Sequence, residues 1–189
     1  MRCFIAAEIS EEVRQELSDV QTSIIRTLDC QSRDLKWVHL DLIHVTMKFL
    51  GDVPDNEIVG VCRAVETAAQ WHAPFDLTVE NVGHFGGRGA RTLWAGTGEG
   101  SEPLAALHQD LEQALDDIGW PPETRRFSAH LTLCRVRNPA TGFDLVPAYQ
   151  PWKAQNFGDT RIDTLTVYHS QLTPEGPVYA AMGTYDLMG

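Results

Sequence analysis

The chain has 189 residues, of which 43% are hydrophobic and 22% charged, a balance typical of a folded protein with an adequate core. Its formal net charge of −11 argues against a protein that coats duplex nucleic acid through a broad basic surface, because that mode needs many phosphate contacts. A local basic pocket for one phosphate is compatible with this charge. We expect one globular unit or two closely packed lobes.

The four cysteines, Cys3, Cys30, Cys62 and Cys134, include no Cys-x-x-Cys pair, so neither a zinc site nor a disulfide framework is expected. The apolar stretch 3–7 is shorter than a signal-peptide core, and no later segment is long enough to span a bilayer. We therefore expect a reduced, cytoplasmic protein without a membrane segment.

In the first half of the chain, strands and helices alternate. Residues 2–9 form an apolar, strand-like run, and Ser10 with two glutamates then begins a helix whose apolar residues recur at helical spacing to residue 28. Short strands are expected at 35–38 and 43–50. A second amphipathic helix is expected from Pro54 to about residue 69.

The second half begins with strands at 75–82 and 92–97, joined by the glycine-rich connection 84–89. A third helix is expected at 101–119, a strand at 128–136, mostly loop at 138–152, and two closing strands at 161–170 and 178–187. Because helices and apparent hairpins are interspersed, the fold class is α+β, with antiparallel or mixed sheets and helices on their outer faces.

Two strand-like segments repeat one pattern, His-x-Thr-x, at His44 with Thr46 and at His130 with Thr132. Side chains two apart share one face of a strand, so each imidazole lies beside its hydroxyl. If the two strands are neighbours, all four groups meet at one cavity suited to acid and base chemistry on a small anion. The competing interpretation is two half-buried histidines hydrogen-bonded to their neighbours. The spacing also indicates a weak internal repeat of two similar lobes.

The tetrapeptides belong to longer blocks that resemble the 2H phosphoesterase superfamily, and within it the RNA 2',3'-cyclic phosphodiesterase family, long called 2'-5' RNA ligase (LigT or ThpR type). The resemblance covers most of the chain. Its blocks are RCFIA at 2–6, WV at 37–38, HVTMKFLGDV at 44–53, GHF at 83–85, LWAG at 93–96, RFSAHLTLCRV at 126–136, SQL at 170–172, and Tyr179. Ala129 and Cys134 stand where the family usually has proline and alanine, and neither change removes a functional side chain.

The resemblance implies a single domain over 1–189 made of two lobes, with two antiparallel sheets around a pseudo-twofold cleft and helices outside. It implies no metal and no cofactor. The implied reaction opens 2',3'-cyclic phosphates of RNA ends or nucleosides to 2'-phosphates, and related enzymes also join or cleave 2'-5' linkages in tRNA halves. We expect a monomer whose partners are such RNA ends or cyclic nucleotides.

Opening a cyclic phosphodiester requires a base for the attacking water and an acid for the departing oxygen, and two imidazoles can supply both near neutral pH. The resemblance assigns His44 as the acid for the 3' oxygen and His130 as the base. The hydroxyls of Thr46 and Thr132 can hydrogen-bond the non-bridging oxygens.

Four further residues are candidates for substrate contacts. Lys48 shares the face of His44 and Thr46 by period-two counting and is a candidate phosphate ligand, although a strand-end lysine is often only solvated. Arg135 matches a family arginine near the phosphate, but it stands an odd number of residues after His130, so it requires a bulge to reach the cleft. Phe127 and Phe85 are candidates to stack on a nucleobase, with core packing as the alternative.

Two other function classes compete with the phosphodiesterase. The first is a binding module of the same fold that holds a nucleotide or RNA end without turnover, which would not need both histidines. The second is a metal-dependent hydrolase using histidines with Asp41 or Asp52, which the single histidine per strand disfavours.

Overall fold

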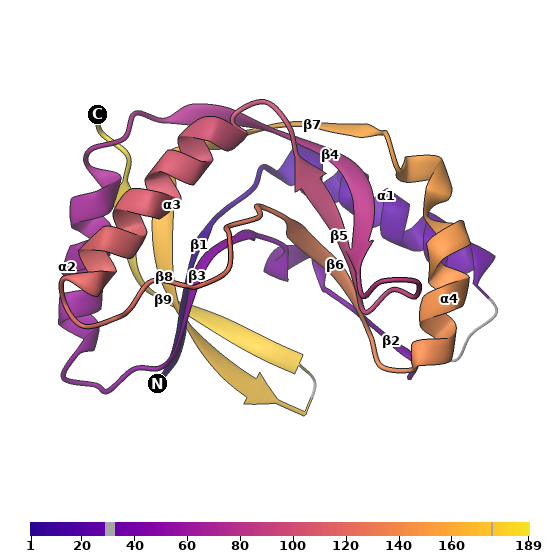
Figure 1. The fold of residues 1–189 in the computed structure, drawn as a ribbon, viewed down its shortest axis with the longest axis horizontal. Helices are drawn as coiled ribbons and strands as arrows, with labels where there is room; N and C mark the ends of the chain where they lie inside the picture. The colour runs from indigo at the N-terminus through magenta and orange to yellow at the C-terminus, as the bar shows by residue number, and fades with distance from the viewer. Residues whose placement is uncertain (29–32, 175) are drawn as a thin grey trace.

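The computed structural model describes residues 1–28, 33–174 and 176–189. Their strands form one curled sheet in the order β7-β4-β5-β6-β3-β1-β8-β9, with β2 paired to β6 off this path (Figure 1). The strands are β1 (Arg2–Ala7), β2 (Leu35–Trp37), β3 (Val45–Asp52), β4 (Phe75–Phe85), β5 (Thr92–Thr97), β6 (Leu131–Val136), β7 (Asn156–Ile162), β8 (Thr164–Thr173) and β9 (Gly176–Asp186). All pairings of these strands are antiparallel.

Helices cover the outside of this sheet at both ends. They are α1 (Glu11–Thr27), α2 (Ile58–Ala69), α3 (Ser101–Asp116) and α4 (Pro139–Ala148), with short 3-10 turns η1 (Leu40–Leu42) and η2 (Gln150–Trp152). α2 and α3 lie together at one end, and α1 and α4 lie at the other (Figure 1). The expected α+β class with antiparallel pairing and outer helices is confirmed.

The sequence pattern of α1 explains its start and its packing. Ser10 caps the helix, its hydroxyl accepting from the Val13 N–H at 3.3 Å, and two glutamates occupy the first turn, where the helix dipole favours negative charge. Val13 and Leu17 are among its fully buried side chains. The helix therefore packs one apolar stripe onto the sheet.

The expected loop at 138–152 is wrong for its first part, because residues 139–148 form α4. Asn138 caps this helix, its side chain accepting from the Ala140 N–H at 3.1 Å, and Pro139 fits the first turn, where no N–H is needed. Gly142 lies so close to Ala90 that a Cβ would approach its carbonyl oxygen to 2.3 Å. Both residue types usually signal loops, but here Pro139 begins a helix and Gly142 allows a close backbone contact.

Two other expected boundaries shift. The strand expected at 161–170 divides between β7 and β8, which are separated at Asp163, and the helix expected from Pro54 begins at Ile58. Turn residues fill 55–57.

The two expected sheets are two halves of one sheet. One half holds β7, β4, β5, β6 and β2, and the other holds β3, β1, β8 and β9. The halves join where the first residues of β3 and β6 pair, Val45 with Leu131. Both residues are fully buried. The curled shape in Figure 1 follows from this short junction, beyond which the two strands run in opposite directions.

An irregularity in β3 overturns the expected position of Lys48. Ala6 pairs with Thr46, and Ile5 pairs with Lys48, so Met47 is an extra residue in β3. Because Ile5 and Ala6 face opposite sides of β1, Lys48 and Thr46 do as well. The period-two count that groups Lys48 with His44 is therefore wrong.

The ammonium of Lys48 is held in a buried ion pair. It lies 2.7 Å from Glu112 Oε1 of α3 and donates to the Pro121 carbonyl at 2.9 Å. Only 4% of Lys48 and 8% of Glu112 are exposed. This ion pair ties β3 to α3, so the lysine stabilises the fold around the site.

No helix among the described residues is long and apolar enough to cross a membrane. Cys3 and Cys62 carry free thiols, and Cys30 lies outside the described residues.

We expect Lys48→Met to lower the free energy of unfolding by about 3–5 kcal/mol, because it leaves the Glu112 carboxylate buried without its cation. Lys48→Met combined with Glu112→Gln should recover most of that loss, since no buried charge is left. Urea unfolding of the three proteins measures both effects. If the free energy of unfolding of Lys48→Met lay within about 1 kcal/mol of that of the original protein, the pair would contribute no more than a surface ion pair.

Candidate active site

The two His-x-Thr segments lie side by side at the junction of the sheet. Val45 pairs with Leu131 in antiparallel sense, and this register, continued by one residue in each direction, sets His44 against Thr132 and Thr46 against His130. Directly opposed residues of neighbouring strands point to one face, with Cβ atoms about 5 Å apart. All four groups therefore share the face opposite the buried side chains of Val45 and Leu131.

The His44 ring is fixed by polar contacts at both nitrogens. Its Nδ1 lies 2.9 Å from the Leu42 carbonyl oxygen, and its Nε2 lies 3.0 Å from Thr46 Oγ1. A carbonyl oxygen only accepts, so Nδ1 carries the proton. In the neutral ring, Nε2 then holds the lone pair, next to the threonine hydroxyl.

Aromatic rings enclose the same imidazole. The ring of Phe4 stacks on His44 with centroids 4.9 Å apart, and Tyr179 approaches its edge at 5.8 Å. This burial lowers the pKa of His44, while the nearby carboxylate of Glu8 opposes the shift by favouring the protonated ring. Phe4 and Glu8 are site residues that the motif search did not single out.

His130 repeats the arrangement on the other half of the sheet. Its Nδ1 donates to the Ser128 carbonyl at 2.7 Å, and Ser128 is again the residue two positions earlier in the chain. In the neutral ring, Nε2 therefore carries the free lone pair. Phe85 meets the ring edge-on, with centroids 5.0 Å apart. Both histidines therefore present the same nitrogen, held in the same tautomer by the same local hydrogen bond.

Two hollows border the two His-x-Thr segments. One, of about 430 Å³, borders Thr46 and His130, and the other, of about 510 Å³, borders His44. The hydrogen bond between His44 and Thr46 joins a residue that lines one hollow to a residue that lines the other. Either hollow is large enough for part of a nucleotide.

The hollow beside His130 has a basic and aromatic rim that includes Arg125, Arg126, Phe85 and Phe127. Phe85 is 42% exposed, whereas Phe127 stacks on His108 at 3.9 Å and so has one ring face covered. Lys48 also borders this hollow, although its ammonium is bound to Glu112.

The bulge that Arg135 requires is present in β6. Trp94 pairs with Thr132, and Leu93 pairs with Cys134, so Leu133 is an extra residue. Arg135 then pairs with Thr92, which shares the face of Trp94, and this places Arg135 on the same face as Thr132. Its charge reaches the neighbouring half of the sheet: burial raises the pKa of Tyr179, and Arg135 and Arg2 oppose that shift.

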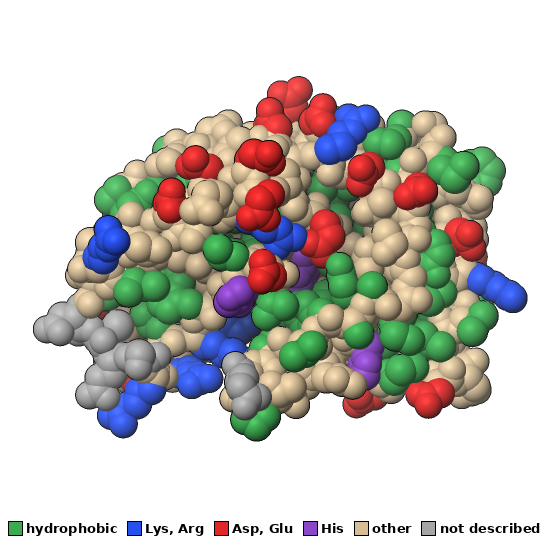
Figure 2. Space-filling model, turned by 180° about the vertical axis from the view of Figure 1, so that it is seen from behind, with side chains coloured by type: hydrophobic (Ala, Val, Ile, Leu, Met, Phe, Trp, Pro, Cys, Tyr) green, Lys and Arg blue, Asp and Glu red, His purple; other side chains and the backbone are tan. Residues whose placement is uncertain are grey.

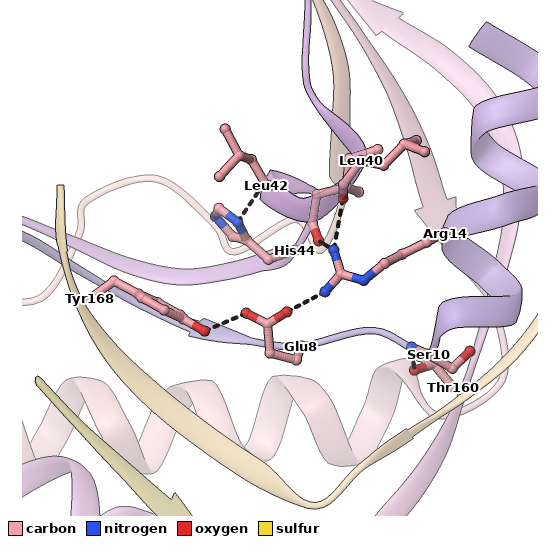
Figure 3. Close-up of polar contacts among 9 residues, drawn as sticks. Glu8, Ser10, Arg14, Leu40, Leu42, His44, Thr160 and Tyr168 are labelled. Atoms are coloured by element: carbon pink, nitrogen blue, oxygen red, sulfur yellow. Dashed lines mark hydrogen bonds and ion pairs between the residues drawn. The ribbon is translucent and has the colours of Figure 1, made fainter. Parts of the chain in front are cut away.

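A polar network behind His44 fixes the loop that carries it (Figure 3). The Arg14 guanidinium donates to the carbonyls of Leu40 at 2.7 Å and Ile43 at 2.9 Å, and it also binds the Glu8 carboxylate. Tyr168 donates to the other Glu8 oxygen at 2.7 Å. Burial and this carboxylate raise the pKa of Tyr168 to about 12, so the phenol remains a donor. A glutamate directly after a buried strand is the sequence signal that could have identified Glu8.

The described residues contain no cluster of three or more histidine, cysteine, aspartate or glutamate side chains placed to hold a metal ion. Asp41, considered as a ligand, is exposed and lies 3.3 Å from His39. What the arrangement offers is proton transfer by two imidazoles, hydrogen bonds from two threonine hydroxyls, and the positive charge of Arg135.

We expect Glu8→Gln to lower the pKa of His44, because it removes the negative charge that favours the imidazolium. The amide can keep the contacts: its oxygen accepts from Arg14, and its NH₂ can donate to the Tyr168 hydroxyl. Titration of the His44 ring by NMR measures the shift. Asp41→Asn, which neutralises an exposed carboxylate of the same hollow, is the matched control and should leave the midpoint in place. An unchanged midpoint in Glu8→Gln would contradict the electrostatic role.

Comparisons with known proteins identify the family of the chain. The family model of the 2'-5' RNA ligase superfamily matches residues 11–173. An Archaeoglobus fulgidus protein named RNA 2',3'-cyclic phosphodiesterase is 30% identical over 190 residues, covering 98% of this chain and 100% of that protein. A protein of the same name from Methanothermobacter thermautotrophicus is 28% identical over 188 residues, covering 99% of each chain.

Solved structures share the fold. The crystal structure of E. coli LigT complexed with 3'-AMP superposes with a TM-score of 0.78 at 21% identity, over 100% of this chain and 98% of that one. A crystal structure of the Thermus thermophilus protein TT0787 superposes with a TM-score of 0.74 at 28% identity, over 100% and 99% of the two chains. With the family model matched over most of its length, the chain belongs to the 2'-5' RNA ligase superfamily.

Proposed function

We propose that this protein is a metal-independent RNA 2',3'-cyclic phosphodiesterase that opens the cyclic phosphate to a 2'-phosphomonoester. The family assignment supports the activity class, since relatives along the whole chain carry that name. The observation that carries the mechanism is the pairing of Val45 with Leu131, which sets two imidazoles of the same tautomer and two hydroxyls on one face.

In the proposed reaction, His130 Nε2 takes a proton from water as the water oxygen bonds to phosphorus. The bond from phosphorus to the 3' oxygen breaks, and the protonated Nε2 of His44 gives its proton to that oxygen. The 2' oxygen stays bonded, so a 2'-phosphate results. Each turnover leaves His130 protonated and His44 neutral, and exchange with solvent restores both.

The surroundings of His44 suit the role of acid. Burial by itself disfavours the imidazolium, but the Glu8 carboxylate and an arriving phosphate anion both favour it. The Nδ1 proton is held by the Leu42 carbonyl, so the acidic proton is the one on Nε2. A weakly basic ring also releases its proton readily to the departing oxygen.

Thr46 and Thr132 would hydrogen-bond the two non-bridging oxygens, and Arg135 would balance their charge as the transition state forms. Phe85 offers the exposed ring for stacking a nucleobase, and Phe127 forms the wall of the same hollow. Lys48 has no direct role in this proposal, because its ammonium is bound to Glu112.

The same site would join RNA ends when a 5'-hydroxyl takes the place of water. The hydroxyl oxygen attacks phosphorus, His130 takes its proton, and the 3' oxygen leaves with a proton from His44, so that a 2'-5' linkage forms. Halves of a cleaved tRNA, one ending in the cyclic phosphate and the other in a 5'-hydroxyl, are a substrate pair of this kind.

The rival function is a module of the same fold that binds nucleotides or RNA ends without turnover. The two proton-transfer groups favour the enzyme, because binding alone needs neither imidazole tautomer fixed. Steady turnover of a nucleoside 2',3'-cyclic phosphate by the pure protein decides between them, and binding without turnover would support the module.

We expect His44→Ala and His130→Ala each to reduce kcat for a nucleoside 2',3'-cyclic phosphate by at least about a hundredfold, because each removes a proton-transfer group. His72→Ala is the matched control, since His72 lies beyond the end of α2, pairs with Asp110 of α3, and lines neither hollow. Circular dichroism checks that the variants fold. A variant at His44 or His130 with nearly full activity would refute its assigned role.

We expect a chelator to leave the turnover rate unchanged, because imidazoles supply both the acid and the base. The product should be the 2'-phosphomonoester, which ³¹P NMR distinguishes from the 3' isomer. Loss of activity in chelator, restored by a divalent cation, would reject the mechanism. A 3'-phosphate product would reverse the assignment of the departing oxygen.

A further inference from the structure

The basic side chains of this acidic protein are distributed unevenly. The chain has 15 lysines and arginines against 26 aspartates and glutamates. Three segments, however, are basic: together they carry six arginines and lysines and only one aspartate. They are 33–38, 86–92 and 131–138. These segments include β2, the loop before β5, and β6, which are neighbours in the sheet.

The sheet register pairs two of these cations, and backbone hydrogen bonds at the ends of the same strands place two more nearby. Lys36 of β2 pairs with Arg135 of β6, so their side chains point to one face at the spacing of adjacent strands, about 4.8 Å. The Arg91 carbonyl accepts from the Val136 N–H at 2.9 Å, and the Arg137 N–H donates to the Asp34 carbonyl at 2.8 Å. We call Lys36, Arg91, Arg135 and Arg137 the basic strip.

All four residues of the basic strip are exposed, and no ion pair among the described residues uses any of them. Figure 2 shows basic side chains gathered at the lower left of one face, near a hollow with histidines, while acidic side chains lie mostly above it. Within the part of the chain that the structure describes, these four side chains are therefore exposed and not held in ion pairs, so they are available to a ligand.

The strip begins at the candidate active site. Through the bulge at Leu133, Arg135 shares the face of Thr132, and Lys36 extends that face by one strand. The other edge of the site lies at β9, where Tyr179 stands beside His44. A chain whose end is held between the two histidines can thus lie along the strip without leaving the sheet face.

We propose that the basic strip binds the backbone phosphates of the RNA strand that precedes the reacting cyclic end, so that the preferred substrate is a single-stranded oligoribonucleotide rather than a mononucleotide. This inference rests on the proposed function for the identity of the reacting end. A nucleoside 2',3'-cyclic phosphate carries a single phosphate, which reacts at the histidines, so it has no phosphate left for Lys36 and Arg91. An oligonucleotide carries further phosphates, each able to form charge-assisted contacts with lysine or arginine.

The remaining negative charge of the protein gives the strip its selectivity. Elsewhere the acidic surface repels a polyanion, so the strand binds productively only where the local charge is positive. The strip is short, and it reads backbone charge rather than base sequence.

The test compares a nucleoside 2',3'-cyclic phosphate with a single-stranded RNA hexamer that ends in the same group. The strip variant is Lys36→Ala/Arg91→Ala/Arg137→Ala, which spares Arg135. The matched control is Arg26→Ala/Arg63→Ala/Lys153→Ala, which removes the same charge from exposed positions on α1, α2 and beyond η2. The ratio of kcat/KM for hexamer and nucleoside should exceed one in the original protein and in the control, and fall at least about tenfold in the strip variant.

Binding of a hexamer that already ends in a 2'-phosphate separates the strip from the chemistry, because no turnover is needed. Fluorescence anisotropy over a salt series should give a slope of log K against log salt that is smaller by about 2 in the strip variant, since three phosphate contacts of a single strand are lost. Equal slopes in the strip variant and the control would overturn the proposal, as would a hexamer that is no better a substrate than the nucleoside. Normal hexamer binding without any turnover would refute the proposed function and leave the strip standing.

Discussion

The site depends on one backbone contact, the pairing of Val45 with Leu131, where the two halves of the sheet join. Both side chains are fully buried, so the contact is fixed by the core beneath it. A slip of one residue in either strand would turn its histidine and threonine to the opposite face. Burial of two apolar residues therefore sets the positions of all four polar groups on the other side.

Local hydrogen bonds then fix the orientation of each imidazole. Each imidazole donates from Nδ1 to the carbonyl two residues earlier, Leu42 in one case and Ser128 in the other. This fixes the tautomer and presents Nε2, which is the nitrogen available for proton transfer. The equivalence of the two contacts shows that the internal repeat extends from the sequence pattern to the hydrogen bonds.

Two bulges decide which cations reach the site. The extra residue Met47 in β3 sends Lys48 to the helix side, where it pairs with Glu112, and the extra residue Leu133 in β6 turns Arg135 toward Thr132. Without the bulges, simple alternation would turn Lys48 toward the face of His44 and Arg135 away from the face of Thr132. Bulges near functional sites often redirect a side chain in this way. The basic strip depends on the second of them, because Lys36 takes its face from Arg135.

The sequence by itself determined the α+β class, most strands and helices, the twin His-x-Thr pattern and the family, because hydrophobic periodicity, caps and paired motifs are local signals. It missed α4, since the two prolines and the glycine of 139–148 resemble a loop until their contacts are known. Only the tertiary structure decided that the two motifs are neighbours, that Lys48 is buried with Glu112, and that Glu8 stands behind His44. Each of these depends on residues far apart in the chain meeting through strand register and bulges, which no local pattern in the sequence specifies.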